Sequence, residues 1–130
     1  MNMMSGCFSL NRRSLARDYG EALKTKGPDI AYTQIIAHQA DTNHYILNEN
    51  NLNDLGYAFM ADGYLPQALE TFKVVTLLFP GSANAYESYG EALETQGDKT
   101  EATLLYQKAL MIDPKNPDAQ GRLKKLEAGN

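Results

Sequence analysis

Residues 89–97 read YGEALETQG, and residues 19–27 read YGEALKTKG, so the two stretches differ only at Lys24/Glu94 and Lys26/Gln96. The glycine that closes each stretch follows helix-forming residues, and glycine at that place is typical of the left-handed residue that ends a helix. A third glycine, Gly63, lies 34 positions before Gly97. A spacing of this size indicates a helical repeat protein.

Shifting the chain against itself by 34 positions aligns small residues and helix breakers. The identical pairs are Asn50/Asn84, Gly56/Gly90, Ala58/Ala92, Gly63/Gly97, Ala68/Ala102 and Pro80/Pro114. A helical hairpin tolerates little change at such positions, so the period is structural. The upstream copy lies 70 positions before its counterpart, two periods plus two residues. We expect the two extra residues in the connection 41–48, where asparagines favour loops and helix caps.

Each period is interpreted as two helices. In the middle copy the first helix begins near Glu49 and ends at Asp62, and the second runs from Leu65 to Phe79. Ser82, Asp98 and the Asn116-Pro117 pair have N-cap chemistry.

These signals predict seven helices, arranged as three hairpins and a last helix, with the first helix over about Arg12–Lys26. The repeats cover about 13–48, 49–82 and 83–116, and a capping helix covers 117–127, all within one domain at 12–127. Residues 1–11 form a leader that is flexible or caps the first repeat. In the last helix we expect Ala119, Leu123 and Leu126 to face inward, with Arg122, Lys124 and Lys125 in solvent.

The pattern resembles the tetratricopeptide repeat (TPR) family. The family pattern has a small residue in the first helix, a turn residue midway, an alanine and an aromatic residue in the second helix, and a final proline. In repeat three these are Gly90, Gly97, Ala102, Tyr106 and Pro114. Repeat two matches with Gly56, Gly63, Ala68, Phe72 and Pro80, and departs at Val75. Repeat one departs at Tyr32 and His44. The resemblance implies an all-α, right-handed superhelix of helix-turn-helix repeats.

In this family the first helices line a concave groove that binds a segment of another protein. Carried over, the resemblance implies that the groove is lined by Arg17, Glu21 and Lys24 in repeat one, by Asn50, Asn53, Tyr57 and Met60 in repeat two, and by Asn84, Glu87, Glu91 and Glu94 in repeat three. Members that bind chaperone tails use cations to hold a terminal carboxylate. Here repeat three has the acids Glu87 and Glu91 where such binding needs cations, so that function is not carried over.

A second resemblance concerns residues 53–57 (NDLGY) and 79–92 (FPGSANAYESYGEA), which are similar to the helical tail of some bacterial serine hydrolases of the β-lactamase-like and esterase types. The hydrolase chemistry itself is missing from the sequence. No serine begins a Ser-x-x-Lys motif, and no Gly-x-Ser-x-Gly occurs. We therefore expect no catalytic residue and no enzyme activity.

Composition restricts the remaining functions. The chain has 130 residues, a net charge of -4, one cysteine and two histidines. The acidic balance argues against nucleic acid, whose binders present basic surfaces. The lone Cys7 rules out a disulfide within the chain, and Cys7, His38 and His44 are too few for a convincing metal site. No apolar run reaches the ~18–20 residues of a membrane helix. We expect no metal, no cofactor and no membrane partner.

The leading hypothesis is a non-enzymatic interaction module for a protein or peptide with basic and apolar side chains. Two alternatives are an accessory domain that serves a hydrolase in trans and a self-assembling structural protein, with a homodimer through the N-terminal end. We expect a cytoplasmic location. Because residues 4–7 are similar to the end of a lipoprotein signal, a start upstream of Met1 would favour a periplasmic or lipoprotein form.

Overall fold

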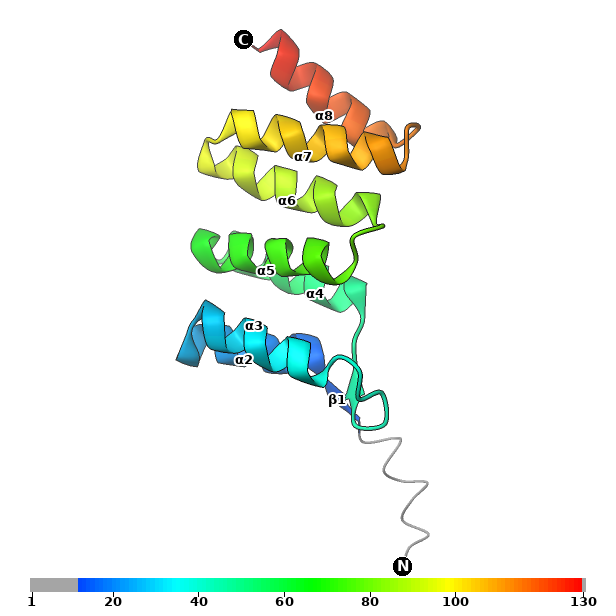
Figure 1. Cartoon of the computed structure of the whole chain (residues 1–130). Coiled ribbons are helices and arrows are strands. Elements are labelled where there is room, and N and C mark those ends of the chain that lie inside the picture. The colour runs from blue at the N-terminus through cyan, green and yellow to red at the C-terminus, as the bar shows by residue number, and fades with distance from the viewer. Residues whose placement is uncertain (1–11, 130) are drawn as a thin grey trace, which may run out of the picture. The chain divides into compact units, whose positions relative to one another are not determined.

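The computed structural model describes residues 12–129, and within that range the chain is all-α apart from two very short strands (Figure 1). The elements are β1 (Arg13–Ser14), α2 (Leu15–Lys26), α3 (Pro28–His38), β2 (Tyr45–Ile46), α4 (Glu49–Ala61), α5 (Leu65–Leu78), α6 (Ala83–Gln96), α7 (Lys99–Ile112) and α8 (Pro117–Ala128). The prediction of seven helices is confirmed for these residues. The leader 1–11, including Cys7, lies outside them.

Contacts divide the chain into two compact units, with the boundary between Asn51 and Leu52 inside α4. The first unit contains the α2–α3 hairpin and the β1–β2 pair, and the second contains most of α4 and all of α5 to α8. The two units are described separately. The single domain at 12–127 and the right-handed superhelical path stay predictions.

In the first unit, α2 begins later than the sequence predicts. We expected a helix from about Arg12, whereas Arg13 and Ser14 pair in parallel with Tyr45 and Ile46. The Ser14 side chain then accepts a hydrogen bond from the Arg17 amide, 3.2 Å away, and caps α2. The added strand pair explains the longer connection of repeat one, because residues 45–46 return to the start of α2.

Glycine turns end the first helices as predicted. Gly27, Gly63 and Gly97 have φ angles of 94°, 86° and 97°, the region that side chains with a Cβ avoid. The expected caps are also present in the second unit. Ser82 accepts from the Ala85 amide at 3.1 Å, Asp98 from Glu101 at 3.1 Å and Asn116 from Ala119 at 3.0 Å.

Close helix contact in the second unit depends on two glycines that are 34 positions apart. A Cβ on Gly56 of α4 would lie 2.6 Å from the Phe72 ring of α5. A Cβ on Gly90 of α6 would lie 2.7 Å from the Tyr106 ring of α7. Each ring therefore packs directly on a bare backbone, which is the reason for the small residue in each repeat.

Candidate functional site

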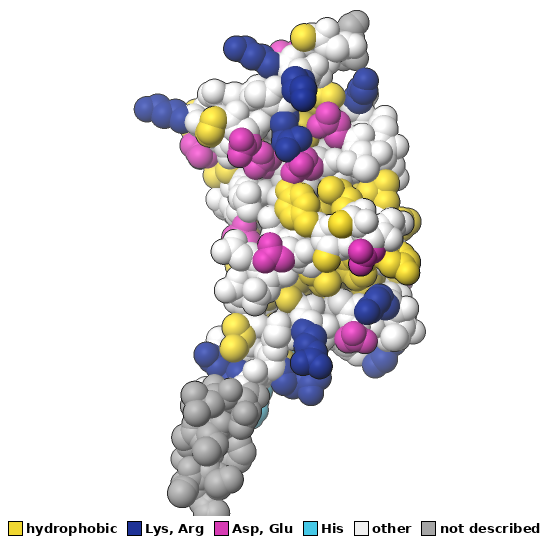
Figure 2. Space-filling model, turned by 180° about the vertical axis from the view of Figure 1, so that it is seen from behind, with side chains coloured by type: hydrophobic (Ala, Val, Ile, Leu, Met, Phe, Trp, Pro, Cys, Tyr) yellow, Lys and Arg dark blue, Asp and Glu magenta, His cyan; other side chains and the backbone are white. Residues whose placement is uncertain are grey.

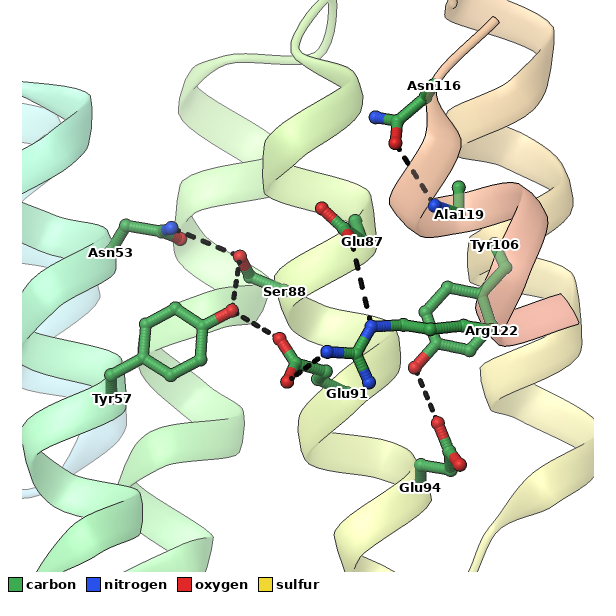
Figure 3. Close-up of polar contacts among 10 residues, drawn as sticks. All are labelled: Asn53, Tyr57, Glu87, Ser88, Glu91, Glu94, Tyr106, Asn116, Ala119 and Arg122. Atoms are coloured by element: carbon green, nitrogen blue, oxygen red, sulfur yellow. Dashed lines mark hydrogen bonds and ion pairs between the residues drawn. The ribbon is translucent and has the colours of Figure 1, made fainter. Parts of the chain in front are cut away.

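A network of polar side chains connects α4, α6 and α8 within the second unit (Figure 3). It begins at the buried hydroxyl of Ser88 on α6. This oxygen accepts a hydrogen bond from the Asn53 amide, and the Ser88 hydroxyl donates its own proton to the Tyr57 oxygen, both at 3.0 Å. Asn53 and Ser88 are 7% and 1% exposed, so these bonds replace water that the Asn53 NH2 group and the Ser88 hydroxyl lose on folding.

Glu91 extends the network toward the C-terminal helix. Its Oε1 accepts a hydrogen bond from the Tyr57 hydroxyl at 2.5 Å, and its Oε2 lies 2.7 Å from Nη2 of Arg122. Burial, reinforced by the Glu91 carboxylate, raises the pKa of Tyr57 to about 12. The Tyr57 phenol therefore stays protonated at neutral pH and serves as the donor.

The position of Arg122 corrects one expectation. The sequence prediction placed this side chain in solvent, but it contacts both Glu87 and Glu91 on α6. The spacing along α8 explains the contact. Ala119 and Leu126 are buried, and Arg122 lies three residues after the first and four before the second, on the same helical face. That spacing is the sequence signal by which Arg122 can be recognised.

Glu87 is the most deeply buried carboxylate of the network, with 7% exposure. Its Oε2 lies 3.7 Å from Nε of Arg122. Burial raises the pKa of Glu87, the negative charge of Asp118 raises it further, and Arg122 opposes both effects. Since the net pKa shift is upward, the guanidinium offsets the buried negative charge only in part.

Glu94 has a separate internal partner. Its carboxylate accepts a hydrogen bond from the Tyr106 hydroxyl at 2.7 Å, and the burial of Tyr106 raises the pKa of that phenol. The three predicted groove acids, Glu87, Glu91 and Glu94, are thus all engaged by side chains of the same chain. Figure 2 shows acidic side chains gathered toward the C-terminal helices with basic side chains beside them.

The other predicted groove residues differ in exposure. In the second unit Asn84 is exposed and Met60 is half-buried. Tyr57 is half-buried, and its ring contacts Phe72 edge-on at a centroid distance of 5.0 Å. Ser88 belongs to the same network, although sequence reasoning did not select it.

The predicted groove residues of the first unit are exposed. They are Arg17, Glu21, Lys24 and Asn50. Glu21 and Lys24 form an ion pair at 3.5 Å on the surface of α2. These residues are therefore available to solvent, but two of the three charged ones already balance each other within α2.

Metal and membrane features are absent from residues 12–129. No group of three His, Cys, Asp or Glu side chains there has the arrangement of a metal site. Within the same range, no helix has the length and apolar character needed to cross a bilayer. His38 stacks on Tyr45 with ring centroids 4.4 Å apart, and His44 pairs with Asp41 at 3.0 Å.

Solved structures with the same arrangement of helices identify the fold. One is the first TPR of Spaghetti (RPAP3) bound to the HSP90 peptide SRMEEVD, with a TM-score of 0.59 and 20% identity over 88% of this chain and 89% of that chain. The chain has the tetratricopeptide-repeat fold. MamA is also similar, with a TM-score of 0.57 and 26% identity over 99% of this chain and 65% of MamA. No protein-family model and no curated protein sequence matches.

The resemblance to the tetratricopeptide repeat is thus confirmed at the level of fold. The second resemblance, to the helical tail of serine hydrolases, stays an interpretation. The polar network gives this chain a feature that the repeat pattern alone does not specify. Arg122 comes from the capping helix, outside the three predicted repeats, yet it neutralises part of the first-helix acids of repeat three.

Proposed function

We propose that this chain is a non-enzymatic protein-interaction module whose first-helix residues bind a partner segment with basic and apolar side chains. The TPR fold supports the general assignment, and one neighbour of that fold is bound to a peptide. The observation that carries the proposal is the surplus of carboxylates around Arg122. Glu87 and Glu91 share this one guanidinium, and the negative charge of Asp118 also acts on Glu87, so negative charge is in excess there.

A further cation fits this surplus. The raised pKa of Glu87 means that its negative charge is under-compensated, and a Lys or Arg from a partner would stabilise it. Because partly exposed charge pairs contribute only ~0–1 kcal/mol, the acids set orientation and association rate more than affinity. Tyr57 and Met60 supply the apolar anchors in this proposal, since aromatic side chains dominate binding energy at interfaces.

The test uses a fluorescent peptide of Lys, Leu and Ser, about 12 residues long, which as a helix spans ~18 Å. Anisotropy measures its binding to the full chain at low and moderate salt. We expect Tyr57→Ala to weaken binding at both salt concentrations, and Tyr57→Phe, which keeps the ring, to weaken it less. We expect the double variant Glu87→Gln, Glu91→Gln to weaken binding mainly at low salt, where the Debye length exceeds ~10 Å and charges interact over a longer range.

Glu127→Gln is the matched control, because it removes one exposed carboxylate of α8 outside the network. If neither the Tyr57 variants nor the Glu87/Glu91 variant changes peptide affinity, the proposal that the peptide binds in this groove is wrong. The accessory-domain and self-assembly alternatives stay predictions, as does the cytoplasmic location.

A further inference from the structure

A second surface, in the first unit, has the opposite charge. A cavity of about 1030 Å³ lies over the α2–α3 hairpin and reaches the β1–β2 pair. Its cationic lining residues are Arg12, Arg13, Arg17 and Lys26, and its acidic ones are Asp18 and Glu21. We call this cavity the basic groove. Figure 2 shows several Lys and Arg side chains at the N-terminal part of the described chain.

The walls of the basic groove come from matching faces of two helices. Asp18, Ala22 and Thr25 follow one another at four and three residues along α2, and Gln34 and His38 lie four apart on α3. Such spacings place side chains on one helical face. Ala22 and Ile35 lie at its apolar base and are 5% and 1% exposed, so the remaining accessible lining is mainly polar and charged.

The positive charge of the basic groove is not balanced within the structure. Both acids are already paired, Asp18 with Arg13 at 2.9 Å and Glu21 with Lys24 at 3.5 Å. Arg12 donates to the Thr42 carbonyl at 3.0 Å, and it forms no ion pair with the residues that the structure describes. Among residues 12–129, Arg17 and Lys26 form no ion pair, and both are exposed.

Size and chemistry indicate the kind of ligand. The cavity is as large as the biggest usual small-molecule pockets, of ~300–1,000 Å³, and its accessible lining is charged rather than apolar. We propose that the basic groove binds a segment of a partner protein that is rich in Asp and Glu. Carboxylates of that segment contact Arg17, Lys26 and Arg12, while Gln34, His38 and Tyr45 offer hydrogen-bonding groups to its backbone and side chains.

Charge also argues against the other occupants. Nucleic acid is a polyanion too, but the whole chain carries a net charge of -4, which opposes it. The exposed face of the C-terminal helix carries Lys124 and Lys125 beside Asp118 and Glu127, so it is not a uniformly acidic partner for the groove, and a second copy bound through Glu87 and Glu91 is an outcome that the test distinguishes. An acidic protein segment carries fewer charges than nucleic acid. It is therefore attracted by the local positive potential of the basic groove and repelled little by the negative charge of the rest of the chain.

The test compares two fluorescent peptides, one composed of Glu, Ala and Ser and one with Gln in place of every Glu. Each has about 12 residues, which as a helix span ~18 Å, the length of α2. Anisotropy is measured with the full chain at two salt concentrations. We expect the Glu peptide to bind and the Gln peptide to bind at least tenfold more weakly. The double variant Arg17→Gln, Lys26→Gln should weaken the Glu peptide roughly tenfold at low salt and less at high salt.

The matched control is Lys124→Gln, Lys125→Gln, which removes the same charge from exposed positions of α8. Equal loss in the control and the groove variant would show general charge attraction and overturn the proposal. Tighter binding of a single-stranded oligonucleotide than of the Glu peptide, lost in the groove variant, would overturn it in favour of nucleic acid. Self-association that disappears in the groove variant would place a second copy there instead.

This proposal and the groove for basic segments fail separately. The Lys peptide responds to Glu87 and Glu91, in the second unit, and the Glu peptide responds to Arg17 and Lys26, in the first. If one peptide behaves as predicted and the other does not, the surface assigned to the second peptide is the one that was wrongly assigned.

Discussion

Arg122 and Glu91 are 31 positions apart in the chain, yet Nη2 of the arginine lies 2.7 Å from Oε2 of the glutamate. This ion pair connects the capping helix to the first helix of repeat three. Because Glu91 also accepts the Tyr57 hydroxyl, a residue of α8 is linked through a single carboxylate to a residue of α4. The capping helix thus helps to organise the acidic surface in addition to covering apolar side chains.

Arg122→Gln should lower the free energy of unfolding by about 1 kcal/mol. The pair is partly exposed, which limits its contribution, but the variant leaves the buried Glu87 without its cation. The same variant should bind the Lys peptide more tightly, because the carboxylates lose their internal competitor. Urea denaturation and anisotropy measure the two effects.

Lys124→Gln is the control, since it makes a similar change at an exposed position of the same helix. Equal destabilisation by the two variants would contradict the role of Arg122. Unchanged or weaker peptide binding in Arg122→Gln would contradict the competition.

Gly90→Ala should destabilise the chain by about 1–3 kcal/mol, because its Cβ would lie 2.7 Å from the Tyr106 ring and force the α6–α7 contact apart. Gly121→Ala is a sharp control. It lies inside α8 with no atom within 4 Å of the added Cβ, so the higher helix propensity of alanine should stabilise it by roughly 0.5–1 kcal/mol. Thermal unfolding followed by circular dichroism distinguishes the opposite signs.

Ser88→Ala should reduce stability by about 1–3 kcal/mol. It removes the acceptor of the Asn53 amide and the donor to the Tyr57 oxygen, and the Asn53 amide is buried, so its N–H group is left without a partner. Thr103→Ala is the control, because that hydroxyl donates to the Lys99 carbonyl of its own helix near the surface. If both variants lose equal stability in urea denaturation, the network contributes nothing beyond helix propensity.

Glu87 should make stability depend on pH. Its pKa is higher in the folded chain than in the unfolded one, so the folded state binds more protons between the two values. The free energy of unfolding should therefore fall as pH rises from about the ordinary value of 4.5 through the folded pKa. Glu87→Gln lacks this dependence.

Urea denaturation of both proteins at several pH values gives the stability difference directly. We expect the wild-type protein to lose stability relative to Glu87→Gln as pH increases through that window. A flat difference, or one of the opposite sign, would show that Arg122 compensates the Glu87 charge fully.

The fold was predictable because its signals are local. Gly27, Gly63 and Gly97 determine where first helices end, and Ser82 and Asn116 determine where helices begin. Each acts within a few residues, so a single sequence carries enough information. The period of 34 then predicts which small residue meets which aromatic ring, as at Gly90 and Tyr106.

The site was less predictable because it depends on residues far apart in the chain. Glu87 and Glu91 were predicted to line the groove, but their partner Arg122 was assigned to solvent along with its lysine neighbours. The basic groove was missed as well. It requires the return of residues 45–46 to Arg13, and the departures of repeat one from the repeat pattern give no local signal for that strand pair.

The aromatic ring of each second helix has one further consequence. Tyr106 reaches Glu94, and the residues 34 positions earlier are Phe72 and Met60. Repeat three thus has a phenol that donates to a carboxylate where repeat two has a benzyl ring and a thioether. Exchanging only one residue of the Tyr106–Glu94 pair for its counterpart in repeat two would leave a hydroxyl or a carboxylate without its partner. Engineers who shuffle these repeats should move each pair as one unit.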